Sequence, residues 1–136
     1  MDEEAQAIAA RLVRRLKEYG AVLTVAESCT GGLLARTFTD IAGASQWFTQ
    51  SWVTYSNESK TRELEVEADL LSEKGAVNAT VAIQMAEGAR KRSGADFSIS
   101  ITGIAGPKHD SSMKPIGLVY VGIAAKHWAN AESMQM

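Results

Sequence analysis

"VAESCTGGLLA", residues 25–35, leads from an apolar run into a helical pattern through a turn that contains serine, cysteine, threonine and two glycines. The run "AVLTVA" at 21–26 predicts a buried strand, and "GGLLARTFTDI" at 31–41 predicts the helix that follows it. A strand that feeds directly into a helix is the first half of a βαβ unit. The stretch therefore indicates an α/β protein and places two nucleophilic side chains, Ser28 and Cys29, at a chain reversal.

Upstream of this stretch, the first segment of the chain has helical periodicity. Its predicted buried face consists of Ile8, Leu12, Leu16 and Tyr19, and Gly20 is placed to end the helix.

Downstream, helical and strand patterns continue to alternate. "WVTYS" at 52–56 predicts a strand, and "NESKTRELEV" at 57–66 predicts a helix that Asn57 caps. A later helix is predicted between Asn78 and Gly94, with one apolar face formed by Val77, Val81, Met85 and Ala89. "DFSISITG" at 96–103 and "IGLVYVGIAA" at 116–125 predict two more strands, and "IAGPKHDSSMKP" at 104–115 predicts a loop between them.

This order of elements predicts a three-layer α/β/α sandwich with a mainly parallel central sheet, formed by residues 1–136 as a single domain. Ligands of such sheets lie beyond the carboxyl ends of the strands. Three polar turns are expected at that edge: "ESCTGG" at 27–32, "TYSNESK" at 54–60 and "TGIAGP" at 102–107.

Composition excludes several classes of function. The net charge of −2 argues against sequence-independent binding of nucleic acid. No apolar stretch approaches the roughly 18 residues of a membrane span, and the acidic start does not resemble a signal peptide. Cys29 is the only cysteine, so a reducing cytoplasm is expected. With His109 and His127 as the only histidines, no zinc site is predicted.

The first turn has two interpretations. A helix that begins near Thr30 to Gly32 directs unpaired backbone N–H groups at a phosphate or an oxyanion. The alternative is a capped helix in a tight turn, without a ligand. Ser28 needs a base to become nucleophilic, and both histidines are expected to face solvent.

Lys60 is the better candidate base, because it lies one turn into the helix after the second strand, near the edge where Ser28 is expected. It acts as a base only if burial or a positive field, such as that of a helix N-terminus, lowers its pKa. Tyr55 can relay a proton. The alternatives are a solvated lysine and an ordinary strand aromatic, and Cys29 is the rival nucleophile.

The third turn can line the same site. Thr102, Gly103 and Gly106 offer a hydroxyl and backbone groups, and Lys114 at the far side of the loop can either meet a phosphate or face solvent.

Five ordered motifs, spread over about residues 5–125, resemble the C-terminal domain of the competence/damage-inducible protein CinA: "TVAESCTGGLLA", "VTYSNESK", "GAVNATVAIQMAEGAR", "SISITGIAGP" and "KPIGLVYVGIA". Stand-alone members of that family are nicotinamide-nucleotide amidases. The resemblance implies the same three-layer fold and hydrolysis of the carboxamide of nicotinamide mononucleotide (NMN) to nicotinate mononucleotide and ammonia, within pyridine nucleotide salvage.

The resemblance also implies roles for individual residues. Ser28 is matched to the nucleophile, Lys60 to the base, Tyr55 to the motif tyrosine and Thr102 to the substrate pocket. No metal or organic cofactor is implied, and the protein is expected to form a homodimer or a higher homo-oligomer. The substrate-binding set is Cys29, Thr30, Gly31, Gly32, Asn57, Thr102, Gly103, Gly106 and Lys114.

Two departures from the family pattern support an alternative function. Lys108, His109 and Asp110 stand where glycines are usual, and the expected final basic stretch and helix are missing or replaced after "AAKHWANAESMQM", so that the domain is expected to be shortened. The alternative is a catalytically weak or silent domain of the same fold that binds a nucleotide or a partner.

Overall fold

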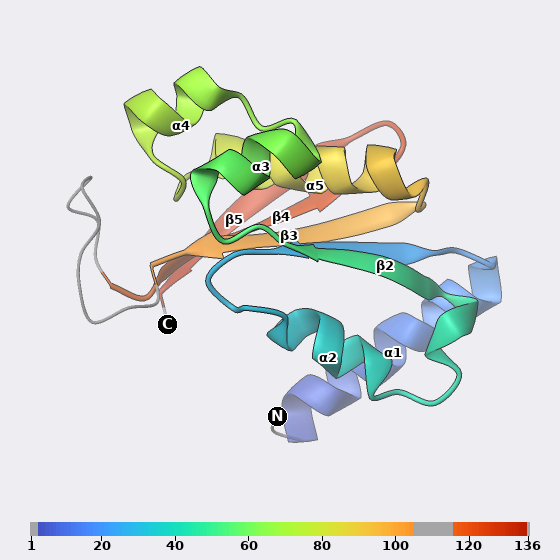
Figure 1. The fold of residues 1–136 in the computed structure, drawn as a ribbon. Helices are drawn as coiled ribbons and strands as arrows, with labels where there is room; N and C mark the ends of the chain where they lie inside the picture. The colour runs from blue at the N-terminus through green and yellow to red at the C-terminus, as the bar shows by residue number, and fades with distance from the viewer. Residues whose placement is uncertain (1–2, 105–115, 136) are drawn as a thin grey trace.

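The computed structural model describes residues 3–104 and 116–135, in which helices and strands alternate (Figure 1). The helices are α1 (Glu3–Tyr19), α2 (Leu33–Thr39), α3 (Asn57–Leu64), α4 (Ala68–Lys74) and α5 (Ala79–Ser93), with a short 3-10 helix at Ala44–Gln46. The strands are β1 (Leu23–Glu27), β2 (Phe48–Val53), β3 (Phe97–Gly103), β4 (Leu118–Ala124) and β5 (Ala129–Gln135).

The strands of the described residues form one five-stranded sheet in the order β2-β1-β3-β4-β5. β1 pairs in parallel with both β2 and β3, whereas β4 pairs antiparallel with β3 and with β5. Helices α1 and α2 cover one face of the sheet, and α3, α4 and α5 cover the other (Figure 1). The predicted α/β class with three layers is confirmed. The sheet is mixed: β2, β1 and β3 are parallel, and β4 and β5 extend it by antiparallel pairing.

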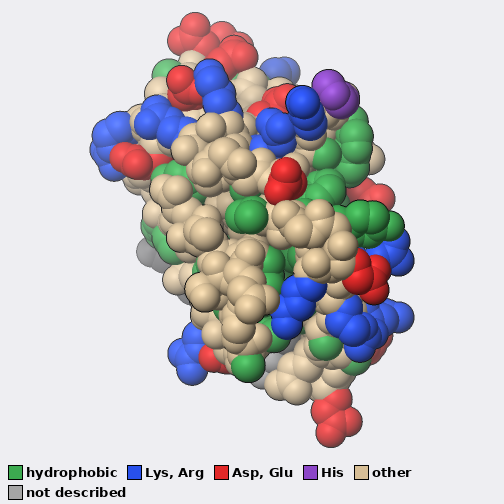
Figure 2. Space-filling model, turned by 90° about the vertical axis from the view of Figure 1, so that its right-hand side faces the viewer, with side chains coloured by type: hydrophobic (Ala, Val, Ile, Leu, Met, Phe, Trp, Pro, Cys, Tyr) green, Lys and Arg blue, Asp and Glu red, His purple; other side chains and the backbone are tan. Residues whose placement is uncertain are grey.

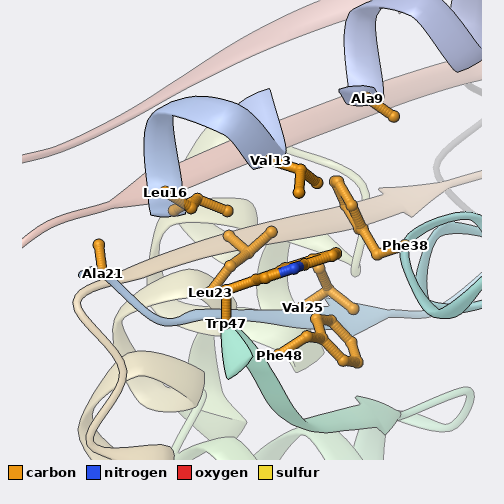
Figure 3. Packing of buried hydrophobic residues seen from close by; sticks show 9 residues of the cluster. All are labelled: Ala9, Val13, Leu16, Ala21, Leu23, Val25, Phe38, Trp47 and Phe48. Carbon is orange, nitrogen blue, oxygen red and sulfur yellow. The ribbon is translucent and has the colours of Figure 1, made fainter. Parts of the chain in front are cut away.

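Aromatic rings form the core between the sheet and the layer of α1 and α2. The rings of Phe38, Trp47 and Phe48 have centroids 5.9 to 6.2 Å apart, and Leu23 and Val25 of β1 lie beside them (Figure 3). Because each aromatic side chain buries a large apolar area, this cluster fixes the position of β1 against α2.

The buried face of α1 agrees with the predicted one in part: Leu16 is buried and Leu12 is partly buried against the core, but Ile8 and Tyr19 are not. Ala9, Val13 and Leu16 face the core, while Ile8 is 52% exposed and Tyr19 is 72% exposed. The smaller side chains of Ala9 and Val13 belong to the same core cluster as the aromatic rings, which already fill most of the room on this side of the sheet (Figure 3). Sequence periodicity therefore located the helix correctly. Which side chains of the helix are buried depends on the room that the close-packed core leaves for them.

Helix α5 follows its prediction at both ends. Asn78 caps it by accepting a hydrogen bond from the backbone N–H of Val81 at 2.9 Å, and Gly94 ends it in the left-handed conformation with a φ of 74°. Three buried hydroxyls of β3 fasten this helix and the segment before it to the sheet: Ser98, Ser100 and Thr102 donate to the carbonyls of Ala86, Ala82 and Ala76, respectively.

A close contact between α5 and α3 leads to our first prediction. A Cβ atom at Gly88 would lie 1.9 Å from the carbonyl oxygen of Leu64, so Gly88→Ala forces the two helices apart. We expect the free energy of unfolding, measured by urea denaturation, to fall by about 2 to 3 kcal/mol. The control is Glu87→Ala at an exposed neighbouring position, with an expected change within about 0.5 kcal/mol. A Gly88→Ala protein as stable as the wild type would contradict this helix packing.

The elements between β1 and α5 and at the end of the chain depart from the sequence analysis in detail. β2 begins earlier than expected and ends at Val53, so Tyr55 lies beyond the strand. Ser56 rather than Asn57 caps α3, through a hydrogen bond from the backbone N–H of Ser59 at 3.1 Å. Neither α4 nor β5 was predicted; β5 contains no β-branched or aromatic residue and is held by its pairing with β4.

The face that carries the amino ends of the parallel strands has a mixed surface. Lys and Arg side chains are interspersed there with Asp and Glu and with scattered hydrophobic residues (Figure 2). None of the helices in the described ranges is long and apolar enough to cross a membrane.

Candidate active site

The turns after β1, β2 and β3 lie at one edge of the sheet, because these neighbouring strands are parallel (Figure 1). Glu27, the last residue of β1, is level with Val53 at the end of β2 and with Ile101 near the end of β3. The structure thus gathers at this edge the polar residues that the sequence analysis had expected to meet there.

Ser28 and Lys60 are in direct contact at this edge. The Lys60 Nζ atom lies 3.0 Å from Ser28 Oγ, within hydrogen-bond distance. Both side chains are shielded from solvent, with exposed fractions of 1% for Lys60 and 6% for Ser28. Lys60 is therefore not a solvated surface lysine.

Two backbone carbonyls complete the surroundings of the lysine. Nζ also donates to the oxygen of Thr54 at 2.8 Å and to that of Tyr55 at 3.3 Å. Because long side chains on a helix point back toward its N-terminus, Lys60 reaches the residues that precede α3.

Burial lowers the pKa of Lys60 from 10.5 to about 8, because the ammonium form loses its hydration; Cys29 opposes the shift. The sequence analysis had named the field of a helix N-terminus as one source of this lowering. Burial was the other source that it named, and the dominant cause is this desolvation of the side chain, which the fold imposes.

Cys29 lies beside the pair but is poorly suited to act as a thiolate. It is half-buried, and burial raises the pKa of its thiol above 9.0, although the backbone amides of Cys29 and Thr30 and the charge of Lys60 act in the opposite direction. A protonated thiol is a weak nucleophile. This environment favours Ser28 over Cys29.

The N-terminus of α2 is occupied by a side chain of the protein itself. The buried carboxylate of Glu27 accepts hydrogen bonds from the backbone N–H groups of Gly32, Leu34 and Ala35 at 2.8 to 3.2 Å. The Gly31 amide donates to the Ser28 carbonyl at 3.1 Å. The expectation that the amides from Cys29 to Gly32 hold a ligand is therefore corrected for Gly31 and Gly32, whose amides already have partners.

The amides of Cys29 and Thr30 are in a different situation. In the part of the chain that the structure describes, they donate to no backbone carbonyl and lie next to the Cys29 thiol, whose pKa they lower. These two N–H groups directly follow Ser28 in the chain. If Ser28 attacks a carbonyl, an anionic oxygen forms next to it and needs hydrogen-bond donors at such a position.

Tyr55 contributes through its backbone rather than through its phenol. The residue is 74% exposed, and no hydrogen bond joins its hydroxyl to Ser28 or Lys60 among the described residues, whereas its carbonyl oxygen accepts from Lys60. The structure thus shows no path for the proton relay that the sequence analysis considered.

The remaining predicted site residues are distributed around this pair. The Thr102 side chain is 1% exposed and its hydroxyl donates to Ala76 at 2.9 Å, while Gly103 packs against the turn so closely that a Cβ atom there would lie 3.2 Å from the Cys29 sulfur. Asn57 is the exposed first residue of α3. Gly106, Lys114 and the sequence at 108–110 lie outside the described residues.

Two residues of the site escaped the sequence analysis. Thr54 supplies a carbonyl to Lys60, a backbone role that no side-chain pattern reveals. Glu27 did carry a signal, because it is an acidic residue at the end of an apolar strand and just before a helix N-terminus. Within residues 3–104 and 116–135, no group of three His, Cys, Asp or Glu side chains is arranged to hold a metal ion.

Comparisons with known proteins agree with this architecture. The family model of the CinA C-terminal domain matches residues 5–136. A CinA-like protein of Geotalea daltonii is 48% identical over 124 residues, which cover 91% of this chain but only 30% of the length of that protein. The nicotinamide-nucleotide amidohydrolase PncC of Escherichia coli K12 is 46% identical over 123 residues, covering 90% of this chain and 74% of that protein.

Solved structures show the same fold. The crystal structure of a CinA superfamily protein from Escherichia coli covers all of this chain with a TM-score of 0.94 at 31% identity, and the match spans 80% of that chain. The competence/damage inducible protein CihA from Agrobacterium tumefaciens has a TM-score of 0.94 at 38% identity, covering 99% of this chain and 82% of its own. With a family match over nearly its whole length, the chain belongs to the CinA C-terminal domain family.

Proposed function

We propose that this protein hydrolyses the carboxamide of NMN to nicotinate mononucleotide and ammonia, with Ser28 as nucleophile and Lys60 as base. The observation that carries the proposal is the buried 3.0 Å contact between Ser28 Oγ and Lys60 Nζ. The identity of 46% to a relative named nicotinamide-nucleotide amidohydrolase supports the choice of substrate.

The surroundings of Lys60 set the direction of proton transfer. A neutral amine has two N–H groups and one lone pair, and Nζ has three neighbours: the carbonyls of Thr54 and Tyr55 and the hydroxyl of Ser28. Carbonyl oxygens only accept hydrogen bonds, so they take the two N–H groups. The lone pair then faces Ser28 Oγ, the one neighbour with a proton to give.

The reaction proceeds by acyl transfer in this arrangement. Lys60 takes the proton from Ser28 as Oγ attacks the carboxamide carbon, and the ammonium form of Lys60 returns that proton to the leaving nitrogen, so that ammonia departs. Lys60 then takes a proton from water, whose oxygen attacks the ester carbon. The acid is released and the Ser28 hydroxyl is restored.

The tetrahedral intermediate carries a negative oxygen next to Ser28. We assign its stabilisation to the backbone N–H groups of Cys29 and Thr30, which have no carbonyl partner in the described residues. Such pre-oriented donors contribute several kcal/mol to transition-state stabilisation in acyl transfer. Thr102 acts indirectly, by holding the end of β3 to the segment before α5.

The direct test is ammonia release from NMN by purified protein at pH 8, with nicotinate mononucleotide identified as the second product. Release of both products in equal amounts supports the proposal. A folded protein that binds NMN in calorimetry without turnover would be the silent nucleotide-binding domain of the alternative. Absence of both binding and turnover would contradict NMN as the ligand.

The pKa of Lys60 gives a prediction for the pH profile of kcat. Lys60 is a base only when neutral, and with a pKa of about 8 roughly a tenth of it is neutral at pH 7. We expect kcat to rise about tenfold for each pH unit below 8 and to level off above it. The substrate phosphate titrates near pH 6, below this range. A flat profile between pH 6.5 and 9 would contradict Lys60 as the base.

Cytoplasmic location and assembly into a homodimer or a higher homo-oligomer remain predictions for this protein. Sedimentation velocity on the purified chain tests the assembly state, with monomer as the contradicting result.

A further inference from the structure

The side chain of Glu27 accepts four hydrogen bonds, none of which is needed to pair β1 with its neighbouring strands. This side chain is fully buried. Oε1 accepts from the Thr30 hydroxyl at 2.6 Å and from the amides of Gly32 and Leu34 at 3.2 and 2.9 Å, and Oε2 accepts from the Ala35 amide at 2.8 Å. All four donors belong to the turn after Ser28 or to the first turn of α2.

The charge of this carboxylate is balanced by backbone groups. Among the described residues, no ion pair involves Glu27, so the N-terminal amides of α2 and the dipole of that helix are its compensation. Gly32, the residue at the N-cap position, has a φ of 110° and no side chain with which to cap the helix. Glu27 supplies that cap from five residues earlier.

The backbone of Glu27 connects the same residue to the lysine side of the centre. Its carbonyl accepts from the Thr54 amide at 2.8 Å, and the Thr54 carbonyl accepts from Lys60 Nζ at 2.8 Å. Ser28 is the next residue along the chain. Glu27 is therefore joined to Ser28 by a peptide bond and to Lys60 by two hydrogen bonds that pass through the backbone of Thr54.

From this arrangement we propose that Glu27 is a positioning residue: its carboxylate fixes the turn at 28–32 so that Ser28 Oγ faces Lys60 and the amides of Cys29 and Thr30 face the reacting carbonyl. This inference rests on the proposed function. The Glu27 carboxylate is fully buried, and the four hydrogen bonds that it accepts, three at Oε1 and one at Oε2, all come from the turn and the first turn of α2. Glu27 thus acts through the turn and not by contact with substrate.

A second consequence concerns where the substrate phosphate binds. The Glu27 carboxylate fills the N-terminus of α2 and repels a second anion there. The phosphate of a nucleotide is accordingly held away from α2, and the amides of Cys29 and Thr30 are left to the oxyanion.

The test compares Glu27→Gln with the wild type. The glutamine keeps the size of the side chain but turns one acceptor into an NH2 group that faces a backbone N–H donor, so the turn must shift. We expect kcat to fall about 10- to 100-fold, with KM for NMN within about threefold. The alkaline rise of kcat should stay near pH 8, because burial sets the pKa of Lys60. A folded Glu27→Gln protein with wild-type kcat would overturn the proposal.

Asp96→Asn is the matched control. Asp96 is also a carboxylate that accepts a backbone amide, that of Val22 at 2.8 Å, but at the opposite end of β1. We expect both variants to lose some stability in thermal unfolding and Asp96→Asn to keep kcat within about twofold. If both lose kcat equally at the same folded fraction, the role of Glu27 is merely structural and the proposal fails.

A second readout separates this inference from the choice of substrate. A fluorophosphonate labels an activated serine by forming a P–O bond as fluoride leaves, without any need for NMN. Labelling of Ser28 in a wild type that does not hydrolyse NMN would refute the proposed substrate, and slower labelling of Glu27→Gln would still support the positioning role. If the wild type neither releases ammonia from NMN nor is labelled at Ser28, both proposals fail.

Thr30→Val keeps the inference testable if Glu27→Gln does not fold. The substitution removes only the 2.6 Å hydrogen bond to the carboxylate and keeps the shape of the side chain. We expect kcat and the labelling rate to fall together by about three- to tenfold, the equivalent of one weakened positioning contact. A rise in KM with unchanged kcat would assign Thr30 to substrate binding instead and would overturn the role of the Glu27 contact.

Discussion

Ser28→Ala is expected to reduce kcat for ammonia release from NMN by about 10³-fold or more, because the neighbouring Cys29 thiol, whose pKa burial raises, is poorly suited to form the acyl intermediate in its place. The fold should be unaffected. The backbone hydrogen bonds of residue 28 to Ile101 and Gly31 do not involve the side chain, and Lys60 keeps both carbonyl partners. Steady-state kinetics, together with thermal unfolding of the same preparations, checks both parts.

Two further variants make this result specific to Ser28. Ser72→Ala removes an exposed hydroxyl in α4 and should leave kcat within about twofold of the wild type. Cys29→Ala keeps the backbone amide and should lose much less activity than Ser28→Ala. If Cys29→Ala lost turnover and Ser28→Ala retained it, the assignment of the nucleophile would be reversed.

Lys60→Met is expected to lose as much activity as Ser28→Ala while changing how stability depends on pH. Below pH 8 Lys60 is charged in both states, and folding moves its ammonium group from water into a buried site. This cost lowers the stability of the folded wild type relative to Lys60→Met. Between pH 8 and 10.5 the unfolded chain binds a proton that the folded chain does not, so wild-type stability rises with pH. A pKa lowered from 10.5 to about 8 corresponds to about 3 kcal/mol over that range.

Urea denaturation at pH 7 and at pH 10.5 measures this effect for both proteins. The stability of the variant relative to the wild type should be greatest at pH 7 and should shrink by as much as about 3 kcal/mol at the higher pH. Lys74→Met, at an exposed position in α4, is the control and should show no such change. A difference between Lys60→Met and wild type that does not vary with pH would mean that Lys60 does not titrate as a buried amine.

Much of the fold follows from local sequence. The caps of α5 at Asn78 and Gly94 and the apolar runs of β1, β3 and β4 depend on neighbours within a few residues, and all are found where the pattern predicts them. β5 has no comparable pattern and is defined by its pairing with β4. The buried stripe of α1 depends on ring volumes contributed by α2 and β2.

For the site, the sequence by itself determined which residues would gather: parallel strands bring the turns at Ser28 and Lys60 to one edge, although 32 positions separate them. Only the tertiary structure decided what each group does there. The burial that lowers the pKa of Lys60, the two carbonyls that orient it and the carboxylate of Glu27 that occupies the helix N-terminus all depend on atoms brought together from different segments. Desolvation and hydrogen-bond competition are properties of that assembled environment, and a linear pattern of residues does not contain them.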